Sequence, residues 1–396
     1  VADDLFLLPT YGAYETPNLT GSVEHLIGFL PPRLRDRAHV HDSFLSLRQA
    51  IGPPSPGGDQ VLFLGAGDLD RHAHAFAVWE SSGGDPWRAW SKYLEPRLSR
   101  SRILRMDEPL ADKTTLRVGG AARAYAEPVC TEDLRELVDA CSLFDLPFFV
   151  LGRGSNLIVP DEGYDGLALR LTGSGWRGVR PSGQDVLVAE AGTRLKEICR
   201  LACEHGLGGF EFLEGIPGTL GGALRMNAGA MGGEICDIVE NVTFLMPDGS
   251  LREMAGEDLT VGYRRCSEAE EGIVLRARLR ATGLSGRAEV RRRIDEFAQK
   301  RWDSQPRESS AGCIFRNPAD DSAGRLIDHH GLKGECLGGA SISNVHANFI
   351  VNRGEATAEE VIGLIRRVRS KVRDSSGVVL EPEVTLLGRS WEEAFN

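Results

Sequence analysis

The placement of glycine constrains this fold more than any other feature of the sequence. Two segments in the middle of the chain, residues 150–159 and 215–230, are rich in glycine. Glycine within a helix or strand costs conformational entropy, so a dense cluster indicates backbone that turns sharply or approaches another group closely. The fold must therefore contain two segments of such backbone. Their glycines include Gly152, Gly154, Gly218, Gly221, Gly222 and Gly229.

The first segment is typical of an anion-binding turn. Strand-like residues end at Leu151, and a second apolar run begins at Leu157. Backbone N–H groups in a glycine turn can converge on an anion because no Cβ stands in the way, and Ser155 and Asn156 add side-chain donors. Pyrophosphate suits such a turn, although a tight turn between two strands is the alternative. Two glycine-rich segments in one chain favour a cradle for a large cofactor.

The charge of the chain limits its partners. The net charge of −11 disfavours binding to nucleic acid or anionic lipid, so we expect neither. No apolar run approaches the roughly 18 residues of a membrane span, and no signal peptide opens the chain, so we expect no membrane insertion. An anionic ligand needs a local basic region. Residues 287–316 hold eight Lys and Arg against five Asp and Glu, although a solvated helix face explains most of them as well.

The eight cysteines are scattered and form no CxxC pair, which is typical of a reducing cytoplasm. Cys199 and Cys203 lie on the apolar face of a predicted helix. We interpret them as buried thiols, because no further ligand completes a metal site nearby. We therefore expect a cytoplasmic protein with no metal. The chain begins with Val1 and soon enters a strand-like run, which suggests that more sequence precedes it.

The first 80 residues alternate strand-like and helix-like segments, as in a partial α/β, Rossmann-like fold. The predicted strands cover 5–8, 38–40 and 61–64, and the predicted helices cover 22–30, 43–50 and 68–79. Turn-forming residues at 80–86 indicate an end to this segment. A polar, Arg-rich connector follows at 92–105.

The rest of the chain is typical of an α+β fold. Strands are predicted at 148–151, 167–171, 186–189, 239–245 and 273–279, with helices at 131–144 and 195–204. A charged helix at 288–302 leads to a third region, with strands at 311–315, 347–351 and 378–387 and helices at 322–329 and 357–373. The last helix is amphipathic. Its predicted buried stripe is Val361, Ile362, Ile365, Val368 and Val372.

Three further polar segments, 262–266, 311–318 and 380–384, do not identify a reaction by themselves. A polar turn, a strand edge and a strand with exposed acids explain them as well. Sequence spacing cannot show whether they meet in space. The residues alone therefore predict an enzyme with a cradle for an anionic ligand, and leave its reaction open.

Taken together, these segments resemble the UDP-N-acetylenolpyruvoylglucosamine reductase family, also called UDP-N-acetylmuramate dehydrogenase. The resemblance covers residues 105–388 and follows seven motifs in the family's order. They are residues 115–120, 151–156, 215–230, 262–264, 310–318, 346–352 and 380–384. No insertion between 273 and 288 could hold the extra tyrosine loop of the long form, so the resemblance implies the short type.

The resemblance implies a two-part FAD-binding domain of the vanillyl-alcohol-oxidase type at 105–287, and an α+β substrate-binding domain at 288–388 whose last strand returns to the active site. FAD would bind noncovalently, and NADPH would supply the hydride. The FAD pyrophosphate would lie against Gly152, Arg153, Gly154, Ser155 and Asn156. The rest of the cofactor would lie against Gly218, Gly221, Gly222, Asn227 and Gly229.

The implied reaction converts UDP-N-acetylglucosamine enolpyruvate to UDP-N-acetylmuramate, a step in peptidoglycan precursor synthesis. Hydride from flavin N5 adds to the methylene carbon, and negative charge spreads onto the substrate carboxylate. Arg264 would hold this carboxylate, and Glu383 would share a proton with it. Cys313 stands at the general-acid position, where the family commonly has serine, and a thiol is the better proton donor. Substrate contacts are implied for Tyr263, Arg301 and Asn317.

Residues 1–91 resemble something else, the end of the C-terminal domain of UDP-N-acetylmuramate–alanine ligase, with a linker at 92–104. The sequence holds no ATP-binding domain of such a ligase, so we expect no ligase activity. Contact with other peptidoglycan-precursor enzymes is the role that a fusion suggests, and an unrelated α/β fragment is the alternative. For the whole chain, the alternatives are another FAD oxidoreductase of the same fold and a non-catalytic docking module for cell-wall enzymes.

Overall fold

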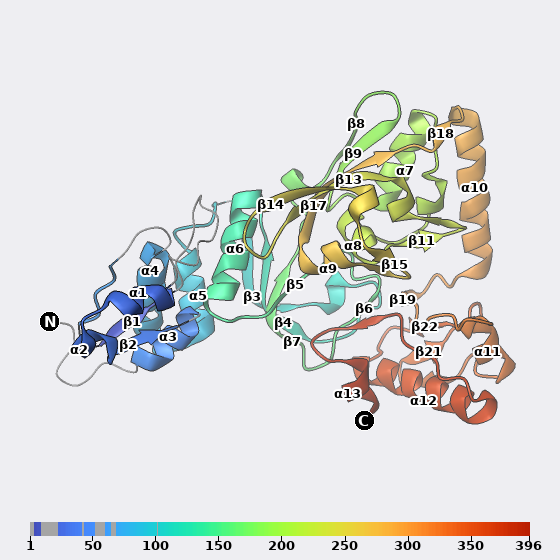
Figure 1. Cartoon of the computed structure of the whole chain (residues 1–396). Coiled ribbons are helices and arrows are strands. Elements are labelled where there is room, and N and C mark those ends of the chain that lie inside the picture. Colours follow the sequence, from blue (N-terminus) through green and yellow to red (C-terminus); the bar gives the residue numbers. More distant parts are fainter. Residues whose placement is uncertain (1–3, 9–22, 42, 52–59, 65–68, 101) are drawn as a thin grey trace. The chain divides into compact units, whose positions relative to one another are not determined.

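The computed structural model describes residues 4–8, 23–41, 43–51, 60–64, 69–100 and 102–396 (Figure 1). The chain forms two compact units. The N-terminal unit comprises residues 1–99 and 135–147, and the main unit comprises residues 100–134 and 148–396. The domain boundaries that the sequence predicts at residues 91, 104 and 287 stay predictions. Among the described residues, no helix has the length and apolar character that crossing a membrane requires.

The N-terminal unit contains a small parallel β–α–β arrangement, as predicted. Strand β1 (Leu5–Leu7) pairs in parallel with β2 (Ala38–Val40), and helices α1 (Val23–Phe29) and α2 (Pro32–Arg35) lie between them in sequence. Helices α3 (Phe44–Ile51) and α4 (Leu69–Ser81) also match predicted helices.

Two details of this unit differ from the prediction. Residues 61–64 form no strand, although their apolar pattern fits one, because no neighbouring strand pairs with them in the described part of the chain. Helix α5 (Pro86–Leu94) follows the turn at 80–86 directly. Its indoles at Trp87 and Trp90 are buried, so the turn joins two packed helices.

The main unit begins with a four-stranded sheet that carries the first glycine-rich segment. The strand order is β3-β4-β7-β5, with β4, β7 and β5 parallel and β3 antiparallel at the edge. Their bounds are β3 Ile103–Pro109, β4 Ala121–Glu127, β5 Phe148–Val150 and β7 Tyr164–Leu169. Helix α6 (Thr131–Leu143) connects β4 to β5, and its residues from Arg135 onward belong to the N-terminal unit.

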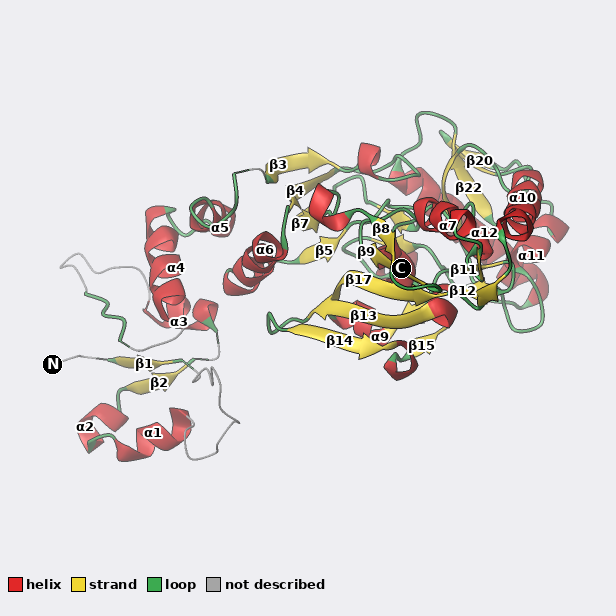
Figure 2. Cartoon of the chain, turned by 90° about the horizontal axis from the view of Figure 1, so that it is seen from above, coloured by secondary structure: helices red, strands yellow, loops and turns green. Residues whose placement is uncertain are grey.

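A five-stranded antiparallel sheet follows, in the order β14-β13-β17-β9-β8, and Figure 2 shows β14, β13 and β17 side by side. Helices α7 (Leu195–Glu204) and α8 (Leu220–Arg225) contact this sheet. Cys199 and Cys203 of α7 are buried, as predicted. The strand bounds are β8 Val179–Pro181, β9 Val186–Glu190, β13 Val239–Leu245, β14 Leu251–Ala255 and β17 Ile273–Arg280.

Short elements connect these sheets. The strand pairs are β10 (Leu207–Gly208) with β18 (Gly283–Leu284), β11 (Gly229–Ala230) with β12 (Gly233–Glu234), and β15 (Val261–Gly262) with β16 (Arg265–Cys266). Helix α9 (Ser267–Glu271) follows β16, and the long helix α10 (Arg287–Ser304) matches the predicted charged helix.

The C-terminal part of the main unit is a four-stranded sheet in the order β19-β22-β21-β20. Its strands are β19 Ser309–Cys313, β20 Cys336–Leu337, β21 Ala340–Ile342 and β22 Phe349–Asn352, and its helices are α11 Ala323–His329, α12 Ala358–Ser376 and α13 Trp391–Phe395. Helix α12 begins with a capping box between Thr357 and Glu360. Every residue of its predicted apolar stripe is buried.

The end of the chain returns to the first glycine-rich segment. The strand predicted over 378–387 is too long, because only β23 (Thr385–Leu386) forms there, and it pairs in parallel with β6 (Leu157–Ile158). Before β23, Pro382 forms an isolated bridge with Phe315. These pairings bring residues 381–386 between β19 and β6.

Candidate active site

The first glycine-rich segment forms the loop between β5 and β6. Gly154 has φ +60°, and a Cβ there would lie 2.8 Å from Thr114 Cα, so only glycine fits without displacing backbone. The hydroxyl of Thr115 donates to the carbonyl oxygens of Gly154 (3.2 Å) and Ser310 (2.7 Å). The loop is therefore held against both the segment before β4 and strand β19.

Three arginines gather at this loop. Burial lowers the pKa of Arg153, and the positive charges of Arg194 and Arg170 lower it further. The Nε atom of Arg170 is buried and has no hydrogen-bond partner. Like charges brought this close repel one another, so an anion among them would remove an unfavourable interaction. Arg170 and Arg194 come from the end of β7 and the start of α7, and sequence reasoning missed both.

The two glycine-rich segments meet in the main unit. A Cβ on Gly152 would lie 3.0 Å from the hydroxyl oxygen of Thr219. The side-chain amide of Asn156 lies 3.9 Å from the sulfur of Met226. The two glycine-rich segments therefore lie next to each other, as a shared cradle requires.

The second segment contains a helix, although its glycine content predicted irregular backbone. Gly221 lies in α8, its N–H donates to the Ala191 carbonyl (2.9 Å), and a Cβ there would lie 3.4 Å from the Ala191 side chain. The absence of a side chain lets α8 approach the sheet closely, which explains the glycine. Beyond the helix, Asn227 has φ +38° and donates to the Glu234 carboxylate (2.6 Å).

The polar side chains predicted for catalysis converge on one carboxylate. Arg264 Nε donates to Glu383 Oε1 at 2.8 Å, and the Tyr263 hydroxyl donates to Oε2 at 3.0 Å. The side-chain amide of Asn156 donates to the Glu383 backbone carbonyl (3.2 Å). Arg264 has φ +57°, a left-handed conformation that non-glycine residues rarely adopt. Residues from three distant segments therefore form one cluster beside the glycine loops.

The thiol of Cys313 belongs to the same cluster. Burial raises its pKa to about 11, the negative charge of Glu383 contributes in the same direction, and the charges of Arg264 and Arg301 oppose it. The thiol is accordingly protonated at neutral pH. Backbone pairing fixes its position relative to Glu383, because the N–H of Glu383 donates to the carbonyl of the next residue, Ile314 (2.7 Å).

Comparison with known proteins decides the family. A reductase from Syntrophomonas wolfei, named UDP-N-acetylenolpyruvoylglucosamine reductase, is 38% identical over 286 residues, which are 72% of this chain and 95% of the relative. A Synechococcus protein of the same name is 43% identical over 291 residues, 72% of this chain and 94% of that protein. The chain belongs to the UDP-N-acetylenolpyruvoylglucosamine reductase family.

The crystal structure of the UDP-N-acetylenolpyruvylglucosamine reductase from Thermus caldophilus supports the same conclusion. It is 39% identical, with a TM-score of 0.63, and the match covers 72% of this chain and 99% of that one. The model of an FAD binding domain matches residues 122–255, and that of the reductase C-terminal domain matches residues 305–387. Both glycine-rich segments lie in the first range, and Cys313 and Glu383 lie in the second.

Two residues predicted to contact the substrate differ in their surroundings. Arg301 Nη1 donates to the Gly215 carbonyl (3.1 Å), whereas its Nε is buried without a partner, and burial lowers its pKa. It can therefore accept an anionic partner. The side-chain oxygen of Asn317 accepts from the N–H of Ala323 (3.0 Å), so this oxygen serves the start of α11. A substrate contact of Asn317 would use its amide nitrogen.

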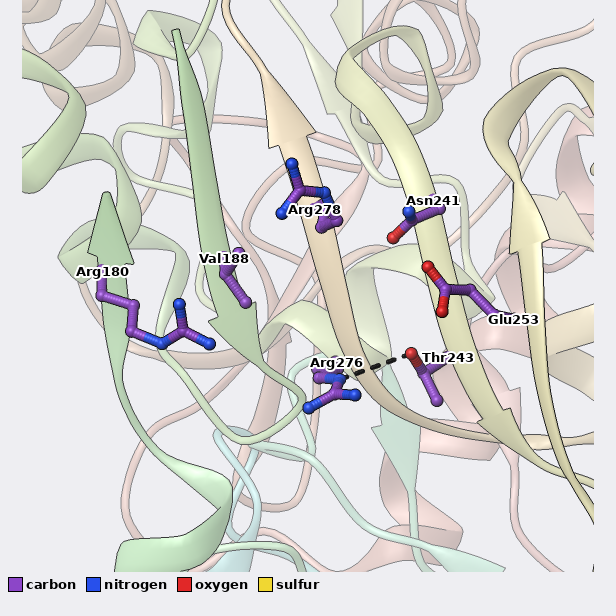
Figure 3. Close-up of a pocket in the computed structure, with 7 residues that line it drawn as sticks. All are labelled: Arg180, Val188, Asn241, Thr243, Glu253, Arg276 and Arg278. Carbon is purple, nitrogen blue, oxygen red and sulfur yellow. Dashed lines mark hydrogen bonds between the residues drawn. The ribbon is translucent and has the colours of Figure 1, made fainter. Parts of the chain in front are cut away.

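A shallow pocket lies away from these residues, on one face of the five-stranded sheet (Figure 3). Its volume is about 210 Å³, and Arg180, Arg276 and Arg278 point into it from β8 and β17. None of the predicted site residues lines it. Nearby carboxylates compensate part of the positive charge of these arginines. Arg278 contacts Glu240 (3.3 Å), and Glu253 lines the same pocket.

Proposed function

We propose that this protein reduces UDP-N-acetylenolpyruvoylglucosamine to UDP-N-acetylmuramate in peptidoglycan precursor synthesis, with FAD as cofactor and NADPH as hydride donor. One observation carries the proposal: Arg264, Cys313 and Glu383 converge beside the two glycine-rich segments. Membership of the reductase family and the match to an FAD binding domain support it.

The residues of the cradle suit FAD. A pyrophosphate would relieve the repulsion among Arg153, Arg170 and Arg194 and would offer an acceptor to the unpaired Nε of Arg170. Gly154 fits against Thr114 only because it has no Cβ, so the loop keeps the glycine turn whose backbone N–H groups suit an anion. A bound FAD would supply hydride transfer from NADPH to the enolpyruvyl carbon.

The chain's own groups then have distinct tasks. Arg264, which Glu383 already orients, binds the substrate carboxylate in this proposal, where negative charge develops. Glu383 keeps the guanidinium in position and can share a proton with that carboxylate. Cys313 retains its proton at neutral pH and is placed to donate it to the second carbon of the enolpyruvyl group. Tyr263 fixes the second oxygen of Glu383.

The test is NADPH oxidation by flavin-loaded protein, with and without UDP-N-acetylenolpyruvoylglucosamine. We expect turnover that depends on the substrate. NADPH oxidation that is unaffected by the substrate would exclude the proposed reaction. The alternative, an oxidase of the same fold with covalently attached flavin, is tested by acid precipitation, which should leave the flavin in the supernatant.

We make two further proposals, one on the cellular location of the protein and one on the role of its N-terminal residues. All eight cysteines are free thiols, which supports function in the reducing cytoplasm. Residues 1–99 lie outside both matched family models, and we propose that they contact other peptidoglycan-precursor enzymes. Deletion of residues 1–99 should leave NADPH turnover unchanged while weakening capture of such enzymes.

A further inference from the structure

The five-stranded sheet has an arginine-rich face that is separate from the candidate active site. Along β17, the buried Ala277 and Leu279 alternate with Arg276, Arg278 and Arg280. Successive side chains of a strand point to opposite faces, so the three arginines share the face away from the buried pair. The shallow pocket of about 210 Å³ lies on this face (Figure 3).

Strand register brings an arginine from another strand to this pocket. Val188 of β9 is the cross-strand neighbour of Arg278 on one side and of Arg180 of β8 on the other. Neighbouring strands lie about 4.8 Å apart, so the backbones of these two arginines are about 10 Å apart across the valine. Arg276 follows about 7 Å from Arg278 along β17. In Figure 3, the side chain of Arg180 extends toward Arg276, so the guanidinium groups can reach one small ligand.

The arginines differ in whether a carboxylate already pairs with them. Arg278 contacts Glu240 (3.3 Å), whereas Arg180 and Arg276 form no ion pair in the part of the chain that the structure describes. Burial raises the pKa of Glu190, and the positive charges of Arg276 and Arg180 oppose this shift. Both arginines therefore lie near the same carboxylate without pairing with it. Two guanidinium groups remain without a carboxylate partner at one pocket.

Hydrogen bonds orient two of the three guanidinium groups. Arg276 Nε donates to the Thr243 hydroxyl (3.5 Å), and Arg278 Nη1 donates to the Ser182 hydroxyl (3.0 Å). Side chains that are already oriented lose less conformational entropy when they bind a ligand. The donors of this pocket are therefore partly arranged for an anion before one arrives.

The side of the pocket formed by β13 and β14 suits a different group. Asn241 and Glu253 line it. A carboxylate accepts from hydroxyl groups and repels a second anion, while an amide both donates and accepts. The ligand should therefore carry its negative charge at one end and hydroxyl groups at the other. The volume of about 210 Å³ is below the ~300–1,000 Å³ of typical ligand pockets, so the ligand must be small.

We propose that this pocket binds a small sugar phosphate, with the phosphate between Arg180 and Arg276 and the sugar hydroxyls against Asn241 and Glu253. A phosphate monoester carries a charge of about −1.5 to −2 at neutral pH, which matches two guanidinium groups without carboxylate partners. Arginine also binds phosphate oxygens through paired N–H donors, which adds geometric specificity to the charge. None of the residues predicted to hold the cofactor or the substrate lines this pocket.

The experiment measures binding to flavin-loaded, full-length protein by isothermal titration calorimetry at one fixed ionic strength, because salt screens exposed charges. The probes are glucose 6-phosphate and glucose 1-phosphate, which present the phosphate at different ring positions. Glucose and inorganic phosphate each carry one half of the proposed ligand. The binding variants are Arg180→Ala and Arg276→Ala, whose side chains are exposed and should leave the unfolding temperature unchanged.

Two control variants locate the binding. Arg252→Ala removes the same charge from β14, but Arg252 alternates with Glu253 and so points to the face of the sheet without the pocket. Arg301→Ala tests the predicted substrate site, because Arg301 Nε is buried there without a partner and could hold a phosphate itself. The flavin absorbance spectrum is recorded in each titration as a second indicator of binding near the cofactor.

We expect at least one sugar phosphate to bind with an unchanged flavin spectrum. Arg180→Ala and Arg276→Ala should each weaken it about tenfold or more, the range for loss of a charge-assisted hydrogen bond. Arg252→Ala and Arg301→Ala should bind like the parent, glucose should not bind, and inorganic phosphate should bind more weakly. The assay needs no turnover, so its result stands whether or not the proposed reaction is confirmed.

Three outcomes would overturn the inference. Neither sugar phosphate might show saturable binding. Inorganic phosphate could bind as tightly as the sugar phosphates, which would indicate a nonspecific anion site only. A loss of affinity in Arg301→Ala without one in Arg180→Ala would place the binding in the predicted substrate site.

Discussion

The glycine loop at 152–156 and the cluster around Glu383 are neighbours in the main unit, but they use the chain differently. The loop relies on missing side chains, and Gly154 fits only because it has no Cβ. The cluster relies on side chains from three separate segments, which converge on one carboxylate. The comparison teaches that the shape of the loop depends on residue type at single positions, whereas the cluster depends on long-range contacts between side chains. The predictions below test this division.

The largest effect is expected at Cys313. Cys313→Ala removes the proton donor, so the half-reaction with substrate should slow by about 10²- to 10⁴-fold, the range for a general acid. Reduction of the flavin by NADPH should be nearly unchanged. Stopped-flow absorbance separates the two half-reactions, and Cys313→Ser, which keeps a hydroxyl, should retain much of the activity. An equal slowing of both half-reactions would refute the role of proton donor.

The next effect concerns Arg264. Arg264→Lys removes the Nε–H that donates to Glu383, so kcat/KM for the substrate should fall on the order of 10²-fold. The matched control is Arg265→Lys. Arg265 contacts Glu270 (2.9 Å) with 63% of its side chain exposed, so its loss should change little. Similar losses of kcat/KM in both variants would show that turnover depends on the hairpin as a whole and not on the ion pair between Arg264 and Glu383.

The burial of Cys313 predicts a pH-dependent reactivity. With its pKa raised to about 11, the thiol is mostly protonated below that pH. Alkylation of Cys313 by iodoacetamide should therefore accelerate about tenfold per pH unit between pH 8 and 10, because only the thiolate reacts. Mass spectrometry follows the modified peptide, with exposed Cys336 as reference. An alkylation rate at Cys313 that no longer rises with pH above 8 would contradict a raised pKa for this thiol.

The smallest expected effect lies in the loop. Gly154→Ala combines a left-handed φ with a 2.8 Å approach to Thr114 Cα, so it should cost about 1–3 kcal/mol and weaken FAD binding roughly tenfold. Gly183→Ala is the control, since Gly183 has φ +81° but nothing within 4 Å of an added Cβ. Flavin fluorescence titration measures affinity. Equal effects on both variants would show that strain, and not the close approach, accounts for the change.

Local sequence patterns predicted many of the regular elements. The strands within 148–279 and the apolar stripe of α12 follow from residue type and periodicity, since side chains of neighbouring residues decide which face is buried. The errors have a common cause. Residues 61–64 have the pattern of a strand but no partner, and the pairing at 378–387 extends over only two residues. A strand needs a neighbour, which the pattern of one segment does not reveal.

By itself, the sequence determined many of the elements, the two glycine-rich segments and, through its motifs, the reductase family. These depend on interactions between residues close together in the chain. Only the tertiary structure decided that Arg264, Cys313 and Glu383 share one site and that Arg170 and Arg194 join Arg153. Contacts between side chains more than a hundred positions apart, such as Arg264 and Glu383, are set by how sheets and returning strands pack, which no local pattern contains.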